Sequence, residues 1–254
     1  MTTTSHSNRD LRDEIRDYWS DRAATFDNDP GHKISAGAEL FAWANLFRRH
    51  LGAANGRSLL DLASGTGEIA LLCKELGFAV TGLDWAEPML ERARSKAPEV
   101  TFLQADAERT MLPDASFDVI VTRHLVWTLI DPKAAFAEWR RLLKPGGKIL
   151  IVDGDFVSRN WLTRMIERFS GSTSHGMVSR HQDIVARVYF NRGARSEAVA
   201  SLLLEAGFEN LRIDNRLSAI HRAQAHLFSW RKSLLRRSEH RYAISASAPM
   251  TTKE

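Results

Sequence analysis

The sequence predicts an α/β fold built on a doubly wound, Rossmann-like sheet of seven strands. From Arg57 onward, short apolar runs alternate with amphipathic segments of helical period. A glycine-rich turn joins the first apolar run to the first of these helices, and Gly or Pro residues end several of the helices. Strands and helices that alternate at this spacing form parallel βαβ units, so we expect an open sheet wound on both faces.

Each element follows from its own pattern. Two helices precede the sheet, because apolar residues recur there at helical spacing. The alternation breaks after Asp155, so we expect a helical insertion over Arg159–Arg192, after the fifth strand. The predicted strands are Ser58–Leu62, Ala79–Leu83, Val100–Leu103, Phe117–Thr122, Lys148–Val152, Phe208–Asp214 and Arg241–Ala248. The predicted helices outside the insertion are Asn8–Thr25, Ala36–Leu51, Glu68–Leu76, Glu87–Lys96, Pro132–Leu143, Ser196–Ala206 and Leu217–Arg237.

Composition limits the class of protein. With 254 residues, 44% hydrophobic and 26% charged, the chain has the composition of an ordinary globular protein. Its one cysteine, Cys73, cannot form an internal disulfide or supply a zinc cluster, and the histidines 175, 181, 221 and 226 lack a compact metal-binding spacing. We therefore expect no metal. The absence of a signal peptide or of a long apolar run predicts a cytoplasmic protein with no stable membrane insertion.

The glycine-rich turn after the first strand is a candidate ligand site. Gly65 and Gly67 allow a sharp turn and a close approach of a ligand to the backbone. The helix that begins near Glu68 points its free N–H groups and its positive end toward that ligand. On its own the turn fits either a dinucleotide or another adenosine cofactor, because Gly65-x-Gly67-x-x-Ala70 also satisfies the dinucleotide fingerprint. A tight turn without a ligand is the plainer alternative.

Three acidic residues narrow the choice. Asp84 ends the second strand, where a carboxylate can accept hydrogen bonds from a ribose diol. Asp61, just before the turn, suits an ammonium group but would sit poorly beside a pyrophosphate. Asp106, after the third strand, can accept from an adenine amine while the N–H of Ala107 addresses a ring nitrogen. Together they favour S-adenosylmethionine over a nicotinamide cofactor.

At these positions the sequence resembles the class I S-adenosylmethionine-dependent methyltransferases, especially the small-molecule group similar to the ubiquinone/menaquinone-biosynthesis methyltransferases. The resemblance covers roughly Leu59 to Asp153, in the order and at the spacing of the family. The segments that carry it are Leu60-Asp-Leu-Ala-Ser-Gly-Thr-Gly67, Gly82-Leu-Asp-Trp-Ala-Glu-Pro-Met89, Ala105-Asp-Ala107, Leu112-Pro-Asp-Ala-Ser-Phe-Asp-Val119 and Leu143-Lys-Pro-Gly-Gly147. It also implies that the last strand is inserted antiparallel.

The resemblance further implies roles for individual residues. Most of them concern the cofactor, which would leave as S-adenosylhomocysteine. Asp61 with Gly65 and Gly67 would hold its methionine end, and Asp84 would bind its ribose. Trp85 and Met89 would lie beside the adenine, and Asp106 and Ala107 would address the adenine edge. Arg123 would make backbone contacts near the sulfonium. Ala63 stands where the family usually has glycine, which puts the tightness of the first bend in doubt.

Methyl transfer from a sulfonium depends mainly on in-line positioning in a dry cavity. His124 follows the fourth strand at the edge where ligands bind, so it is a candidate base; a structural histidine there is the alternative. Trp127 is expected to be core packing. Tyr18 and Trp19 lie on the first helix, which either covers the cofactor as a lid or packs as an ordinary amphipathic helix.

The acceptor pocket is expected in the insertion. Its polar candidates are Asp155, Arg164, His175, His181 and Tyr189, and the predicted substrate-binding set is Trp19, His124, Asp155, His175 and His181. The basic helix over Leu217–Arg237 would pack internally, on a second subunit or on a membrane surface. We expect four parts: N-terminal helices that include the lid (1–56), a cofactor-binding core (57–155), an acceptor-binding insertion (156–195) and the completion of the sheet (196–254).

The predicted function is therefore methyl transfer from S-adenosylmethionine to an oxygen or nitrogen of a small metabolite, with aromatic and heterocyclic compounds as candidates. The rivals are a nicotinamide oxidoreductase, a cofactor-binding module without catalysis, and a methyltransferase of a lipid or tRNA. The modest net charge of +4 argues against a nucleic-acid partner. We expect a monomer or a homodimer.

Overall fold

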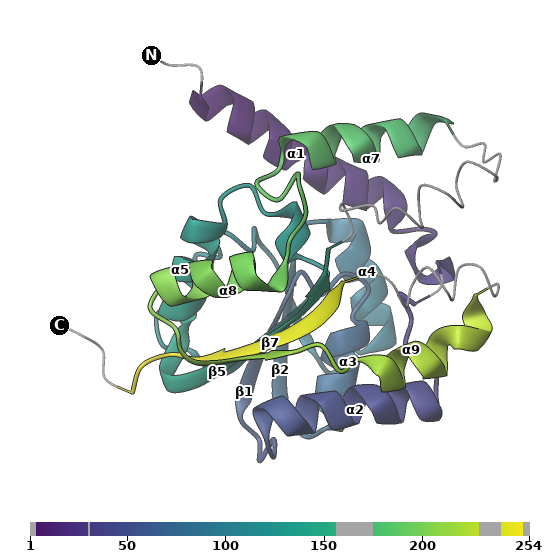
Figure 1. Cartoon of the computed structure of the whole chain (residues 1–254). Coiled ribbons are helices and arrows are strands. Elements are labelled where there is room, and N and C mark those ends of the chain that lie inside the picture. The colour runs from purple at the N-terminus through teal and green to yellow at the C-terminus, as the bar shows by residue number, and fades with distance from the viewer. Residues whose placement is uncertain (1–3, 30, 156–174, 229–239, 251–254) are drawn as a thin grey trace.

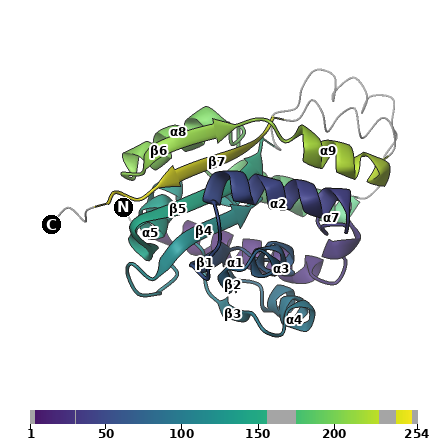
Figure 2. The same cartoon turned by 90° about the horizontal axis from the view of Figure 1, so that it is seen from below.

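The computed structural model describes residues 4–29, 31–155, 175–228 and 240–250. Helices cover both faces of one seven-stranded sheet, whose strand order is β3-β2-β1-β4-β5-β7-β6 (Figures 1 and 2). The first five strands pair in parallel, and β7 lies antiparallel between β5 and β6. The predicted doubly wound fold and the antiparallel last strand are both confirmed.

All seven predicted strands are present. They are β1 (Ser58–Leu62), β2 (Ala79–Asp84), β3 (Thr101–Gln104), β4 (Phe117–Arg123), β5 (Leu143–Gly154), β6 (Glu209–Asp214) and β7 (Arg241–Ser247). The largest difference from prediction is β5, which begins at Leu143 instead of Lys148. Leu143 pairs with Phe117, and the register then shifts before Val119 pairs with Lys148, so the glycine-rich approach to the strand also joins the sheet.

The described helices follow the predicted ones closely up to residue 206. They are α1 (Thr4–Arg22), α2 (Ala38–Leu51), α3 (Glu68–Glu75), α4 (Glu87–Lys96), α5 (Pro132–Leu142), α7 (His175–Arg187), α8 (Ser196–Glu205) and α9 (Ser218–Gln224), with 3₁₀ turns at Phe26–Asn28, Val126–Thr128 and Ala225–Leu227. Their starts follow from the local sequence. The Asp131 side chain accepts a hydrogen bond from the Ala134 N–H, and Pro132 takes the first helical position of α5.

Alternate side chains of the central strands enter two separate hydrophobic cores. On β1, Leu59 packs under α2 and α3, whereas Leu60 packs under α5 and α8. The same alternation on β4 places Val119 in the first core and Ile120 in the second. Because successive strand residues point to opposite faces, one sheet can bury both helical layers. The ligand edge at the carboxyl ends of the strands is then fixed from both sides.

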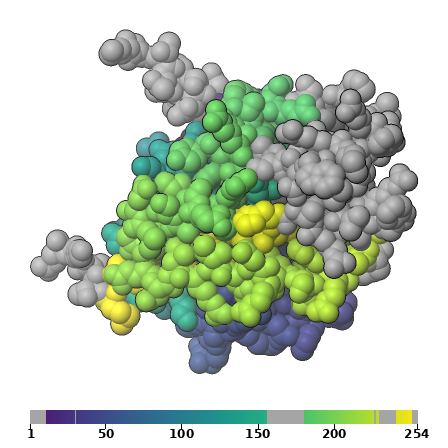
Figure 3. All heavy atoms as spheres, viewed as in Figure 1, coloured from purple at the N-terminus to yellow at the C-terminus, as the bar shows by residue number. Residues whose placement is uncertain are grey.

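Helices α1 and α7 lie across the carboxyl ends of the strands and cross each other there (Figure 1). Tyr18 of α1 packs with Ile184 of α7 and with Val188, which directly follows that helix, in a small hydrophobic cluster of its own. Two ion pairs, Arg180–Asp21 and Arg187–Glu14, join the same two helices. In the space-filling view, α7, α8 and the segment that leads to α9 form a continuous outer surface (Figure 3).

The predicted long helix over Leu217–Arg237 is wrong in its described part. Helix α9 ends at Gln224, a 3₁₀ turn follows, and Phe228 has extended backbone angles. Gln224 donates a buried hydrogen bond to Glu39 of α2 at 2.6 Å, so α9 is anchored on α2 at the point where it ends. Trp230 and Leu234 of the predicted apolar stripe lie outside the described residues, as do residues 156–174 of the predicted insertion.

Candidate active site

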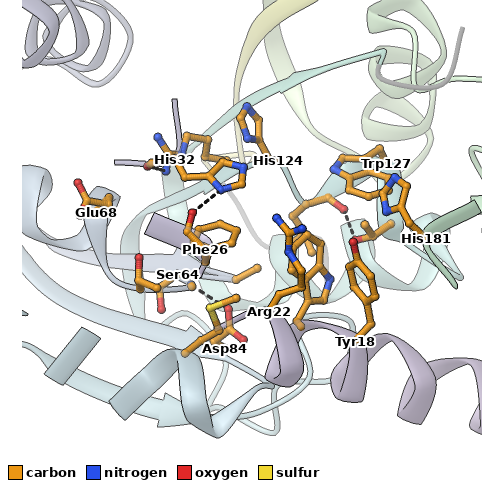
Figure 4. A pocket seen from close by; sticks show the side chains of 18 of the residues that line it. Tyr18, Arg22, Phe26, His32, Ser64, Glu68, Asp84, His124, Trp127 and His181 are labelled. Atoms are coloured by element: carbon orange, nitrogen blue, oxygen red, sulfur yellow. Dashed lines mark hydrogen bonds between the residues drawn. The ribbon is translucent and has the colours of Figure 1, made fainter. Parts of the chain in front are cut away.

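A cavity of about 1040 Å³ opens at the carboxyl ends of β1, β2 and β4, beneath α1 and α7. Figure 4 shows Ser64, Glu68 and Asp84 on one side of it, and Tyr18 among the aromatic residues on the other. Ligand pockets for small molecules typically measure about 300–1,000 Å³. The cavity therefore has room for a cofactor and a second small molecule.

The floor of the first side is the glycine-rich turn after β1. Gly65 and Gly67 both have left-handed backbone angles, with φ of 53° and 85°. A Cβ on Gly67 would lie 3.0 Å from the Cβ of Ala93, so glycine is also needed there for α3 to pack closely on α4. Ala63 has a φ of 54°, which shows that the bend is as sharp as a glycine would make it, at the cost of a strained alanine.

Asp84 ties this turn to the end of β2. Its Oδ2 accepts the Gly65 N–H at 2.8 Å, and its Oδ1 accepts the Ala86 N–H at 2.9 Å. Burial raises the pKa of Asp84, although these backbone donors act against the rise. Each carboxylate oxygen has a further lone pair, so the group can still accept hydrogen bonds from a diol in the cavity.

Asp61 and Arg123 form the charged interior of the same side. Asp61 is 1% exposed, and burial raises its pKa to about 8, with the charge of Arg123 acting against that rise. Its Oδ2 has no hydrogen-bond partner among the described residues, and neither does Nη1 of Arg123. The other terminal nitrogen of Arg123 donates to the His32 carbonyl at 2.6 Å. Asp61 and Arg123 therefore each keep one buried polar atom with capacity for a ligand.

A lysine clamps the segment that covers this side of the cavity. Nζ of Lys96 lies 2.6 Å from Oδ2 of Asp27 and 2.7 Å from Oε1 of Glu68, and it donates to Oγ1 of Thr66 at 3.0 Å. The second oxygen of Glu68 accepts the Ile34 N–H at 2.8 Å. These contacts hold residues 26–34 against the glycine-rich turn.

The far side of the cavity is aromatic. The ring of His181 on α7 lies 5.3 Å from that of Trp127 and 5.8 Å from that of Tyr18, centroid to centroid. Trp19 stands edge-on to Trp127 at 6.4 Å. Arg22, one turn further along α1, also lines the cavity. Planar apolar walls with a few polar groups are typical of sites that hold an aromatic ligand.

The chain resembles known methyltransferases in both sequence and fold. A family model described as a methyltransferase domain matches residues 60–151. A demethylmenaquinone methyltransferase of Thermus thermophilus is 41% identical over 103 residues, which cover 38% of this chain and 47% of that protein. A ubiquinone/menaquinone biosynthesis C-methyltransferase of Bdellovibrio bacteriovorus is 34% identical over 145 residues, or 55% of this chain and 61% of that one. The chain thus spans about half to three fifths of the length of these relatives.

A solved structure shares the fold. Phosphoethanolamine N-methyltransferase 2 of Haemonchus contortus superposes with a TM-score of 0.68 and 20% identity, over 95% of this chain and 60% of that one. Residues 60–151 thus match a methyltransferase domain, and the chain has the fold of S-adenosylmethionine-dependent methyltransferases. The resemblance predicted from the motifs is therefore confirmed. The matched domain contains β1 through most of β5 and hence the glycine-rich turn, Asp61 and Asp84.

The fold brings ten of the predicted site residues to one cavity. They are Tyr18, Trp19, Asp61, Ala63, Gly65, Asp84, Met89, Arg123, His124 and His181. The side chain of Arg123, for which we expected only backbone contacts, lines the cavity as well. Trp127, expected in the core, is buried and also lines the cavity.

The other predicted residues lie outside the cavity lining. Gly67 is at the junction of α3 and α4, and the Ala107 carbonyl accepts a hydrogen bond from Trp139 at 2.8 Å. Trp85 lies beneath the guanidinium of Arg16. Asp155 is buried beside β7, where its N–H donates to the His240 carbonyl. His175 begins α7, and its side chain lies outside the described part of the chain, as does Arg164.

Asp106 is engaged by the first helix. Its Oδ2 pairs with Nη1 of Arg12 at 2.5 Å, and its Oδ1 accepts the Glu108 N–H at 2.9 Å. The second terminal nitrogen of Arg12 pairs with Glu108 at 2.7 Å. The adenine-edge role predicted for Asp106 thus has a competitor within the chain, and α1 is fastened to the loop after β3.

His124 stands at the end of β4 in an unusual conformation. Its φ of 61° is left-handed, and its N–H donates to the Val152 carbonyl of β5 at 3.0 Å. The side chain lines the cavity beside Leu125. A strained non-glycine residue at a ligand-binding edge is consistent with a functional position.

Several cavity residues escaped prediction because they come from irregular segments. Phe26 and His32 stack at 4.0 Å between ring centroids, from either side of the residue-29 bend. Arg22 and Arg241 enter from the ends of α1 and β7. No hydrophobic periodicity marks such positions. The one sequence signal was that aromatic and basic residues occur close together at the end of α1 and just after it.

The described part of the chain contains no cluster of three or more His, Cys, Asp or Glu side chains placed to hold a metal ion. Within the same residues, no helix combines the length and apolar character needed to cross a bilayer.

Proposed function

We propose that this chain transfers the methyl group of S-adenosylmethionine to a small aromatic acceptor, held between α1 and α7. The observation that carries the proposal is one continuous cavity. At one end Asp61 and Arg123 each have one buried polar atom without a partner among the described residues, and at the other end the walls are aromatic rings. S-adenosylmethionine supplies an already activated methyl group on a sulfonium. The residues need only position the reactants and exclude water.

The donor end fits a zwitterion with an attached ribose. Asp61 would receive the methionine ammonium, because its buried Oδ2 lacks a partner among the described residues. Arg123 would receive the carboxylate through Nη1, which is equally buried. Asp84 would accept the ribose hydroxyls beside the Gly65 N–H. Met89, buried next to Ala86, would pack on the adenine.

The acceptor end fits a planar ring. Trp19, Trp127 and His181 offer ring faces and edges from three different elements, and α1 with α7 closes the cavity from outside. We keep oxygen or nitrogen as the acceptor atom, with His124 as a nearby candidate base at the strand edge. Residues 1–56 and 156–195 would then cover the donor core of 57–155, and 196–254 would complete the sheet.

Methylation at a ring carbon is the second candidate. The two relatives cited above are named for quinone biosynthesis, and one of them is named a C-methyltransferase. A hydroxylated ring can react at its oxygen or at the neighbouring carbon, and the same aromatic walls suit both outcomes. A lipid acceptor, or a module that binds the cofactor without catalysis, would need a different acceptor end.

Calorimetry with S-adenosylhomocysteine, followed by transfer assays with tritiated S-adenosylmethionine, tests the proposal. Phenols, anilines and hydroquinones serve as probe acceptors, and mass spectrometry with NMR of the products separates O-, N- and C-methylation. We expect binding of S-adenosylhomocysteine and transfer to at least one aromatic probe. Failure to bind it would overturn the donor half of the proposal. Binding without transfer to any aromatic probe would overturn the acceptor half.

A further inference from the structure

We propose that Arg22 and His181 activate the acceptor: the guanidinium holds an aromatic hydroxyl oxygen as an oxyanion, and the imidazole accepts its proton. This inference rests on the proposed function, and it narrows the acceptor from any aromatic nucleophile to a hydroxylated ring. It also moves the proton acceptor from His124, which follows β4, to a residue of α7.

The two side chains reach the cavity from different helices. Arg22 ends α1 and His181 lies in the first half of α7, and both line the cavity. Figure 4 shows Arg22 between the donor residue Asp84 and the aromatic residues Tyr18 and His181. The charge of Arg22 acts on both of these aromatic residues, which places the guanidinium within electrostatic reach of each. A ligand oxygen at the rings therefore meets the cation before it reaches the donor end.

Arg22 keeps one donor for a ligand. Its Nη2 pairs with Asp29, whereas its Nε is buried and has no hydrogen-bond partner among the described residues. A buried guanidinium N–H without an acceptor costs free energy, and an oxyanion in the cavity would satisfy it. Asp29 is 45% exposed and does not line the cavity, so it offsets part of the guanidinium charge from outside, and Nε is the donor left for a ligand.

The distribution of charge within the cavity favours a hydroxyl over an amine. The carboxylates among its described lining residues are Asp61, Glu68 and Asp84, all beside the glycine-rich turn. At the aromatic end the described lining carries Arg22 and His181 but no carboxylate. A protonated amine placed there would be repelled by the guanidinium, while a phenolate would be attracted.

His181 is suited to take the proton. Burial lowers its pKa, and the charge of Arg22 lowers it further, so the imidazole is neutral at pH 7. The groups that face it are Arg22 and Tyr18 from α1 and the Trp127 ring from the 3₁₀ turn after β4. Burial raises the pKa of Tyr18, which stays protonated and does not compete for the proton.

The step balances without a further reactant. The acceptor O–H bond breaks, its proton goes to His181, and its electron pair stays on the oxygen beside Arg22. That oxygen, or the ring carbon next to it, then forms a bond to the methyl carbon. The carbon–sulfur bond breaks with its electron pair on sulfur, giving the thioether product. A methylated ring carbon returns its extra proton to solvent, and His181 likewise deprotonates after product release.

Ionisation of a bound phenol can be followed without methyl transfer. 4-Nitrophenol is titrated into the protein loaded with S-adenosylhomocysteine, and the visible absorbance of its phenolate is measured against pH. We expect the apparent pKa of the bound probe to fall by about one to three pH units, as beside a cation in a partly buried site. Arg22→Gln should abolish the fall. Arg187→Gln, which removes an exposed guanidinium that pairs with Glu14 across the same two helices, should leave it intact.

Turnover then tests the proton acceptor. His181→Phe keeps a ring against Tyr18 and Trp127. At pH values below the pKa of the acceptor hydroxyl, we expect this variant to lower kcat about 100-fold. The loss should diminish at high pH, where the acceptor ionises by itself. His124→Gln should not reproduce this pH-dependent loss.

Three results would overturn the proposal and leave the proposed function standing. In the first, the protein binds S-adenosylhomocysteine but the bound probe ionises at the same pH as in water. In the second, Arg22→Gln lowers the pKa of the probe as much as the parent protein does. In the third, His181→Phe keeps the full pH–rate profile of the parent. A failure of 4-nitrophenol, 2-naphthol and 1,4-naphthohydroquinone alike to bind would overturn it as well. Failure to bind S-adenosylhomocysteine would instead overturn the proposed function itself.

Discussion

Asp61, near the end of β1, and Arg123, at the end of the neighbouring strand β4, each keep one buried polar atom without a hydrogen-bond partner among the described residues. Burial disfavours the charged form of both, raising the pKa of Asp61 to about 8 and lowering that of Arg123. A zwitterionic ligand would supply the missing partner to each. These two unsatisfied buried atoms would thus favour the methionine end of the cofactor over a ligand without both an ammonium and a carboxylate.

Asp61→Asn is expected to weaken S-adenosylhomocysteine binding by about 100-fold or more, as for the loss of one partner of a buried ion pair. The parent should also bind more tightly as the pH rises toward 8. Asp61 is protonated in the free protein at pH 7 and must ionise to pair with the ammonium, so binding releases a proton. Calorimetry in two buffers of different ionisation enthalpy measures that proton, which should be absent in Asp61→Asn.

The same pKa has a consequence for stability. Because the folded-state pKa of Asp61 lies above the unfolded value of about 3.9, its relative contribution to stability is greatest below pH 4 and is lost as the pH rises through 8. Ligand-free Asp61→Asn should therefore melt no lower than the parent at pH 8. A clearly lower Tm there would show that Asp61 is a structural charge and not one held for a ligand.

Gly67→Ala is expected to destabilise the protein more than Gly52→Ala. Both glycines have left-handed φ, but a Cβ at Gly67 meets Ala93 of α4 at 3.0 Å, whereas one at Gly52 meets nothing within 4 Å. Backbone strain alone costs about 1 kcal/mol or more, and overpacking adds about 1–3 kcal/mol. Denaturant unfolding of both variants measures the difference. Equal losses would mean that α4 moves aside freely.

Lys96→Met should loosen the cover of the donor end. It leaves the partly buried carboxylates of Asp27 and Glu68 without their shared cation, so residues 26–34 lose the clamp that holds them on the glycine-rich turn. We expect S-adenosylhomocysteine affinity to fall about tenfold and amide exchange to rise in that segment. Lys74→Met, at an exposed position on α3, is the control. If the amide exchange rates of that segment are unchanged in Lys96→Met, the stacking of Phe26 on His32 is enough to hold the segment in place.

Much of the fold was predictable, because strands such as β1 and β4 are apolar runs bounded by turn residues. The donor end was predictable too, since Asp61, Gly65 and Asp84 occupy fixed places relative to β1 and β2. The acceptor end was not. Arg22 reaches it through the crossing of α1 over the strand ends, a tertiary contact without a local pattern, and Trp127 reaches it from the 3₁₀ turn after β4. Over the described residues, the predicted continuation of the helix past Gln224 is wrong for a related reason, since Gln224 is held by Glu39 of α2 where α9 ends.

Asp118 gives the protein an acid-sensitive contact far from the cavity. A hydrogen bond from Lys144, helped by those from Ser58, lowers the pKa of Asp118 to about 2. Since this lies below the unfolded value of about 3.9, the contact stabilises the fold above pH 4 and loses its effect as the pH falls to 2. Asp118→Asn should lower Tm modestly at pH 7 and not at pH 2. A constant difference across that range would contradict the ionic origin.

Arg12→Gln should free α1 from the loop after β3. Arg12 is the residue that pairs with both Asp106 and Glu108, and α1 carries Tyr18, Trp19 and Arg22 into the cavity. We expect faster amide exchange along α1 and weaker protection of that helix by S-adenosylhomocysteine. Asp17→Asn, which removes an exposed charge that pairs with Arg16 inside the same helix, controls for the loss of a surface charge. If amide exchange along α1 is the same in the two variants, the packing of Tyr18 on α7 is what holds α1 in place. The salt bridges of Arg12 to Asp106 and Glu108 would then contribute little, as is common for partly exposed ion pairs.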